Sequence, residues 1–236
     1  MYRLLPAVAL FALVVNSQAP LVRAEEKKGV SLFNGKDLDG WKTKDEVKSK
    51  WKVCSVQLDP KNDKVFAEMT ATPGTSAFLT NLTTRGGTDL FTTEKFGDVT
   101  VELEFMYPKG SNSGVYLMGE YEVQILDSFG KEKVGPGDLG GLYKAAAPTT
   151  NASKKPGEWQ KFVIEFQAPK FEGDKKTVNA KFVKVTLNDT VIHENIEMKT
   201  QTPGGLTGKE AATGPLMFQG DHGPVAFRNI KITPKK

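Results

Sequence analysis

The chain has 236 residues, with 32 basic and 28 acidic side chains and a net charge of +4. Hydrophobic residues make up 39% of it, which is enough for a sizeable core in a soluble protein. The 23 glycines and 13 prolines favour many turns over long helices. This composition excludes a collagen, a coiled coil, a wholly disordered chain and a polytopic membrane protein.

The first 24 residues have the pattern of a secretory signal peptide. Arg3 gives a short basic start, residues 4–15 are almost wholly apolar, and Ala24 ends a segment suited to signal peptidase. We expect cleavage after Ala24, a periplasmic or secreted mature chain, and a single domain over residues 25–236. The apolar run is too short to span a bilayer comfortably, so we expect no membrane insertion after cleavage.

The sequence of the mature chain argues against a nucleic-acid-binding surface and against a zinc site. Cleavage removes two arginines and no acid, so the net charge falls from +4 to +2. Nucleic-acid binding needs a dense basic stripe, whereas these lysines are interspersed with acids. The only cysteine, Cys54, lies in an alternating segment and is expected to be a small core residue. One cysteine and two histidines, His193 and His222, exclude a Cys/His zinc site.

Alternation of apolar and polar residues predicts β-strands through most of the chain. It is clearest in residues 99–106, where every second side chain is apolar. Similar patterns cover residues 121–125, 162–166, 183–187, 216–218 and 225–232. Only residues 45–50 look briefly helical. Many antiparallel strands without crossover helices predict an all-β sandwich or barrel.

Turn sequences separate these predicted strands. Asn188-Asp189 is a two-residue hairpin candidate, because both residue types tolerate positive φ. Residues 220–224 are expected to close a final hairpin. Asn112 lies in a Gly-flanked turn, where its amide either shapes the turn or binds a ligand hydroxyl.

Three polar residues, Glu120, Glu122 and Gln124, share one face of a predicted strand. Neighbours on that face are about 7 Å apart, a spacing that suits a sugar between two carboxyl groups. An ordinary solvated strand face is the alternative. Asp127 follows with opposite parity, so it either caps the turn at residues 128–130 or points into a site if the strand is bulged.

The two histidines lie in different contexts. His222 is in a tight loop beside Asp221, and it is either a general base or a turn stabiliser, since imidazole titrates near neutral pH. His193 follows a hairpin and is expected at an exposed edge. No nucleophile elbow or phosphate-binding glycine loop is present in the sequence.

Five ordered segments resemble the 3-keto-disaccharide hydrolase family, over residues 31–232. They are Ser31-Leu32-Phe33-Asn34-Gly35-Lys36-Asp37-Leu38-Asp39-Gly40-Trp41, Phe96-Gly97-Asp98 with the strand after it, Asn112-Ser113-Gly114-Val115, Tyr121-Glu122-Val123-Gln124-Ile125-Leu126-Asp127, and the closing run from Gly214-Pro215-Leu216 to Phe227-Arg228-Asn229-Ile230. Departures, such as Gln160 where the family usually has Asn, bear on loop shape, and so on substrate preference, more than on fold.

The resemblance implies a concanavalin-like jelly roll of two curved antiparallel sheets. It also implies action on glycosides or disaccharides oxidised to a ketone at carbon 3. The ketone acidifies the hydrogen on carbon 2, so a base can remove it and the enolate can expel the group on carbon 1. Water then adds to the unsaturated sugar, and the net result is hydrolysis. This route needs a base, an enolate stabiliser and a leaving-group acid.

The resemblance carries candidate roles to particular residues. Glu122 or His222 is the expected base, Arg228 or a divalent cation stabilises the enolate, and Asp127 is an acid or an orienter. The expected ligands of sugar hydroxyls are Asn112, Gln124, Tyr143 and Gln219. A cation would be held by Glu122, Asp127 or His222. For Arg228, a structural ion pair with a buried acid is the competing interpretation.

Two further functions stay open at this point. A non-catalytic carbohydrate-binding sandwich would keep its sugar affinity without Glu122 and His222. A conventional endoglucanase of the laminarinase type would use Glu120 and Glu122 to cleave unoxidised glucan, although the usual spacing of catalytic acids along that strand is missing.

Overall fold

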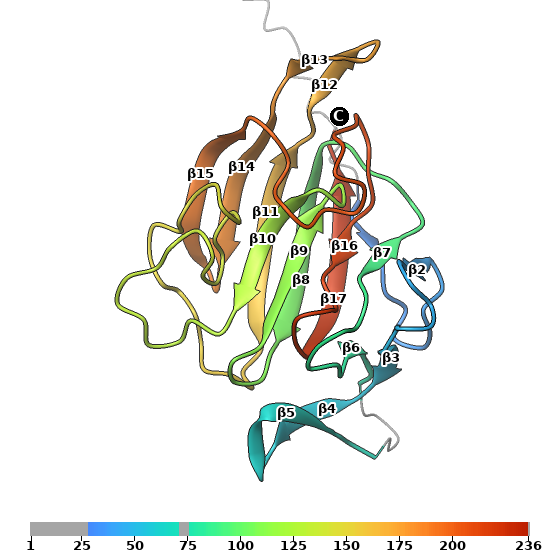
Figure 1. Cartoon of the computed structure of the whole chain (residues 1–236), viewed down its shortest axis with the longest axis vertical. Coiled ribbons are helices and arrows are strands. Elements are labelled where there is room, and N and C mark those ends of the chain that lie inside the picture. Colours follow the sequence, from blue (N-terminus) through green and yellow to red (C-terminus); the bar gives the residue numbers. More distant parts are fainter. Residues whose placement is uncertain (1–27, 71–75, 236) are drawn as a thin grey trace, which may run out of the picture.

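A computed structural model describes residues 28–70 and 76–235, and the predicted signal peptide lies outside these ranges. The described residues contain strands, turns and loops but no helix, so none of their elements is a helix long and apolar enough to cross a membrane. Two antiparallel sheets pack face to face, with β10, β9 and β16 in front of β11, β8 and β17 (Figure 1). The predicted all-β jelly-roll sandwich is confirmed.

The larger sheet has eight strands. Their spatial order is β15 (Thr190–Met198), β14 (Ala180–Leu187), β11 (Gln160–Gln167), β8 (Val99–Met106), β17 (Val225–Pro234), β6 (Phe78–Asn81) and β3 (Trp51–Cys54), with β1 (Val30–Ser31) paired to β17. The alternation predicted for residues 99–106 is observed in β8, where Val101 and Leu103 face the core while Glu102 and Glu104 face outward.

The smaller sheet has five strands and carries the site described below. Their spatial order is β10 (Tyr121–Leu126), β9 (Asn112–Leu117), β16 (Met217–Phe218), β7 (Leu90–Thr92) and β2 (Trp41–Thr43). Two hairpins, β4 (Val56–Asp59) with β5 (Asn62–Glu68) and β12 (Lys170–Glu172) with β13 (Lys175–Val178), project from opposite ends of the molecule in Figure 1.

Aromatic side chains join the two sheets in the core. The rings of Phe218 on β16 and Phe227 on β17 stack with centroids 4.0 Å apart. Trp51 stacks on Phe227 and Trp41 on Phe218, so both tryptophans are core residues. Cys54 is partly buried, and its burial raises the pKa of the thiol.

Three local predictions are wrong. Residues 45–50 form a turn instead of a helix, because the Asp45 carboxylate accepts the backbone N–H groups of Val47 and Lys48. Residues 220–224 do not close a hairpin, since β16 and β17 belong to different sheets. His193 is buried, and its Nε2 lies 2.8 Å from the carbonyl oxygen of Gly140.

Candidate functional site

A pocket of about 220 Å³ lies on the outer face of the smaller sheet. It brings together six of the eight residues to which the sequence assigned catalytic or binding roles, namely Asn112, Glu122, Gln124, Tyr143, Gln219 and His222. Its other lining residues are Tyr116, Lys144, Pro203 and Gly204.

Strand parity places the polar side chains together. On β10, Tyr121, Val123 and Ile125 enter the core, so Glu122 and Gln124 point outward. In the β9–β10 pairing, Glu122 is opposite Tyr116 and Gln124 is opposite Gly114. The pocket floor is therefore built from one face of one hairpin, with Gln219 arriving from the end of β16.

Glu122 supplies the carboxyl group of this pocket. Its side chain is only 2% exposed, and burial raises the pKa of the carboxyl from 4.5 to about 8. The neighbouring charges of Asp89 and Asp221 raise this pKa further, while the Tyr116 hydroxyl lowers it. Glu122 therefore holds a proton at neutral pH in the folded protein.

Gly114 makes room for this carboxyl group. A Cβ atom at Gly114 would collide with the Glu122 carboxylate and would lie 3.0 Å from its Cδ and Cγ atoms. Because the Glu122 side chain crosses the place of the missing side chain, a glycine is needed opposite Gln124.

His222 reaches the pocket from the loop after β16. Its Nδ1 lies 2.5 Å from Oδ1 of Asp221, which orients the imidazole ring. The loop itself is fixed by Asn81, whose Nδ2 donates to the carbonyl oxygens of Gly220 and Gly223 at 3.0 and 2.9 Å. The histidine is thus an exposed side chain on a well-held loop.

Two acceptors in the pocket have no hydrogen-bond partner within the described residues. They are Oδ1 of Asn112 and Oε1 of Gln219, and both atoms are buried. An unpartnered buried acceptor costs free energy, so such atoms at a pocket indicate a ligand that donates hydrogen bonds. Hydroxyl groups of a sugar have this property.

Two segments that the sequence did not single out complete the pocket walls. Lys144 lies in a tight turn with φ 57°, a left-handed conformation that is uncommon for lysine. Residues 202–208, here called the strap, supply Pro203 and Gly204. The strap is tied to the β9–β10 turn, since Leu206 N–H donates to the Gly119 carbonyl at 2.7 Å.

Glu120 holds the strap and is separated from Glu122 in function. Its carboxylate accepts the N–H and the hydroxyl of Thr207 at 2.8 and 2.7 Å, and the N–H of Gly208 at 3.1 Å. The two glutamates do not face one pocket, which removes the geometric basis for a laminarinase-type pair.

The remaining two candidates, Asp127 and Arg228, lie away from this pocket. The Asp127 carboxylate accepts the N–H of Gly110 at 2.9 Å, so it caps the turn before β9. Arg228 is on the outer face of the larger sheet, where Nε donates to Oε2 of Glu104 at 2.6 Å. Its guanidinium carbon lies 4.0 Å from the ring centroid of Trp159.

The described residues contain no group of three or more His, Cys, Asp or Glu side chains arranged to hold a metal ion. Of the three expected ligands, Glu122 and His222 line the pocket, whereas Asp127 binds the turn.

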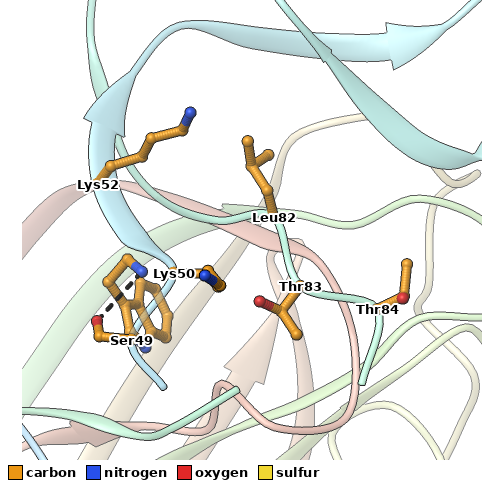
Figure 2. A pocket seen from close by; sticks show the side chains of 7 residues that line it. Ser49, Lys50, Lys52, Leu82, Thr83 and Thr84 are labelled. Atoms are coloured by element: carbon orange, nitrogen blue, oxygen red, sulfur yellow. Dashed lines mark hydrogen bonds between the residues drawn. The ribbon is translucent and has the colours of Figure 1, made fainter. Parts of the chain in front are cut away.

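A larger pocket of about 570 Å³ lies near the start of β3 (Figure 2). Its lining is made of lysines, hydroxyl side chains, Trp51 and Leu82, with no carboxyl or imidazole group. Lys52 at its edge is paired with Glu68. This larger pocket therefore lacks the carboxyl and imidazole groups that acid–base chemistry uses, whereas the Glu122 pocket is lined by both.

A sequence model of the 3-keto-alpha-glucoside-1,2-lyase-like domain matches residues 28–233. The chain belongs to this family. Membership confirms the resemblance drawn from the five segments, and it makes the chain a carbohydrate-active domain. A comparison with curated proteins gives no match.

Solved structures show the same fold for this 3-keto-alpha-glucoside-1,2-lyase-like domain. A crystal structure of a proposed glycosyl hydrolase from Parabacteroides distasonis has 28% identity and a TM-score of 0.66, and the match covers 88% of this chain and 84% of that one. A second such protein from the same organism has 18% identity and a TM-score of 0.59, with 87% and 93% covered. The second likeness bears on the fold alone.

Proposed function

We propose that the chain is a secreted enzyme that cleaves 3-keto-glycosides or 3-keto-disaccharides by elimination across carbons 1 and 2, followed by addition of water. Family membership and the similarity to a proposed glycosyl hydrolase support a carbohydrate-active enzyme. The observation that carries the finer proposal is that a buried, protonated Glu122 and His222 line the same sugar-sized pocket.

His222 acts as the general base. It takes the proton from carbon 2, and the electron pair of that bond forms an enolate with the carbon 3 ketone. Asp221 holds the imidazole through Nδ1, which leaves Nε2 free to accept the proton. An exposed histidine on a fixed loop suits this role, because it returns its proton to water afterwards.

Glu122 acts as the general acid. The enolate expels the oxygen on carbon 1, and that oxygen takes the proton from the Glu122 carboxyl. A carboxyl group with a pKa of about 8 is protonated at neutral pH, so it has the proton to give. Water then adds across the carbon 1–carbon 2 double bond, with its hydroxyl on carbon 1 and a proton on carbon 2. Glu122 regains from solvent the proton that His222 released, which completes a net hydrolysis.

The other pocket residues bind the sugar. Asn112 and Gln219 accept hydrogen bonds from hydroxyl groups through their unpartnered oxygens. Gln124 and Tyr143 line the same walls. Lys144 is the only cationic side chain that lines this pocket in the described part of the chain, and it stabilises the enolate by its charge.

The test is to incubate residues 25–236 with a 3-keto-disaccharide and with its unoxidised parent, each with and without a chelator. We expect sugar release, or an unsaturated intermediate, from the keto form alone. Cleavage of the unoxidised parent at a comparable rate would overturn the elimination route. Binding of both sugars without turnover would instead show a carbohydrate-binding domain.

A further inference from the structure

A second pocket, of about 300 Å³, lies on the same sheet face across the strap from Glu122. One row of paired residues joins the two places, since Glu122 is opposite Tyr116, Tyr116 opposite Met217, and Met217 opposite Phe91. Neighbouring strands are about 4.8 Å apart, so Phe91 lies roughly 14 Å from Glu122 along this row.

The strap is a wall of both pockets. Pro203 and Gly204 face the Glu122 pocket, whereas Leu206 and Thr207 face the second one. The second pocket is therefore a separate cavity with its own lining, held in shape by the hydrogen bonds between the strap and Glu120.

The lining of the second pocket is mainly apolar near the sheet. Phe91 and Met118 come from the sheet and its turn, and Leu206 and Pro215 come from the segments above it. Phe91 is only partly buried, so its ring is available to a ligand. A flat apolar group of small-ligand size fits such a surface.

The rim of the second pocket is positively charged. It carries three exposed lysines, Lys42, Lys95 and Lys209, and none of them pairs with an acidic side chain among the described residues. The acid in the lining, Glu120, already accepts three hydrogen bonds from the strap. The rim thus has ammonium groups to offer to an anion.

We propose that this second pocket binds an aromatic carboxylate. The ring lies against Phe91, Met118 and Leu206, and the carboxylate lies between the lysine ammonium groups. An aliphatic anion would leave the apolar wall uncovered, and a neutral ring would leave the lysines without a partner. Both features are therefore needed in the ligand.

The proposal is tested by titrating benzoate, benzyl alcohol and acetate into the ¹⁵N-labelled mature chain and following amide shifts by NMR. We expect saturable shifts around Thr93 and Thr213 with benzoate, and affinities at least tenfold weaker for benzyl alcohol and acetate. Added salt should weaken benzoate binding. This readout needs no turnover, so it stands or fails separately from the proposed enzyme activity.

Two triple variants decide whether the lysines of the rim bind the carboxylate of benzoate. Lys42→Ala/Lys95→Ala/Lys209→Ala should lose at least tenfold in benzoate affinity. Lys61→Ala/Lys64→Ala/Lys175→Ala removes the same charge from exposed sites on the two projecting hairpins and should bind as the parent does. The proposal would be overturned if both triple variants lost benzoate affinity equally, or if benzyl alcohol bound as tightly as benzoate. It would also be overturned if the amide shifts were confined to residues outside this pocket.

Discussion

The polar side chains discussed on the two outer faces of the sandwich differ in whether they have hydrogen-bond or ion-pair partners. On the larger sheet, Arg228 is satisfied by Glu104 and by the Trp159 ring. On the smaller sheet, Glu122 is buried without a cationic partner among the described residues, and within the same ranges the side-chain oxygens of Asn112 and Gln219 have no hydrogen-bond partner. A paired side chain such as Arg228 needs no explanation beyond stability. Buried groups without partners lower the stability of the fold, and a bound ligand would explain why they are there.

The sharpest test of this comparison is the activity of a Glu122→Gln variant. The amide keeps the size of the side chain but has no acidic proton to give, so we expect turnover of a 3-keto-disaccharide to fall by about 10² to 10⁴-fold. Steady-state kinetics would measure it, with Glu120→Gln as the matched glutamate substitution. A loss confined to Glu120→Gln would move the chemistry to the other side of the strap.

The same variant should change how stability depends on pH. Glu122 binds its proton more tightly in the folded chain, so its contribution is fully present below pH 4.5 and is lost as the pH rises toward about 8. With about 1.4 kcal/mol for each pKa unit, the loss is about 5 kcal/mol as an upper bound. Urea unfolding at several pH values from 4 to 9 measures it.

The unfolding free energy of Glu122→Gln should not show this transition, so the variant should become more stable relative to the parent as the pH rises. A smaller slope of the same sign should persist, because burial also raises the pKa of Asp89. A constant stability difference between parent and variant at every pH would contradict the buried, protonated state of Glu122.

A substitution at Gly114 tests the packing beneath the carboxyl group. Gly114→Ala places a methyl group against the Glu122 carboxylate, so we expect a loss of about 1–3 kcal/mol in unfolding free energy and reduced turnover. Gly97→Ala is the control, since its new Cβ would meet only ordinary contacts at 3.5 Å or more. Similar thermal denaturation midpoints for the two variants would show that the floor of the pocket adapts.

Much of this site follows from period-two alternation. The pattern placed Glu122 and Gln124 on one face of β10, and the dipeptide Asn188-Asp189 formed the predicted turn with φ of 49° and 66°. The alternation misled at Glu120, because β10 starts at Tyr121 and the preceding residue belongs to a turn. The Glu120 side chain therefore hydrogen-bonds to the strap and does not share the strand face with Glu122.

Other features depend on contacts that no local pattern records. His193 is buried by the carbonyl of Gly140, which is 53 residues away in sequence. Pro203 and Gly204 reach the pocket because the strap is bound to Glu120, from more than 80 positions away. Tyr116 reads as one more apolar strand residue until its pairing with Glu122 is known. Long-range pairing decides each of these positions.

The smallest effect is expected on the satisfied face, at Arg228. Arg228→Met keeps the apolar stem and removes the pair with Glu104 and the contact with Trp159, both of which are partly exposed to solvent. We expect about 1 kcal/mol less stability and turnover within about threefold of the parent. Glu104→Gln should match it in unfolding experiments. A loss of turnover as large as that of Glu122→Gln, with stability kept, would mean that Arg228 acts on the substrate, and full hydrogen bonding would then no longer distinguish the structural face from the functional one.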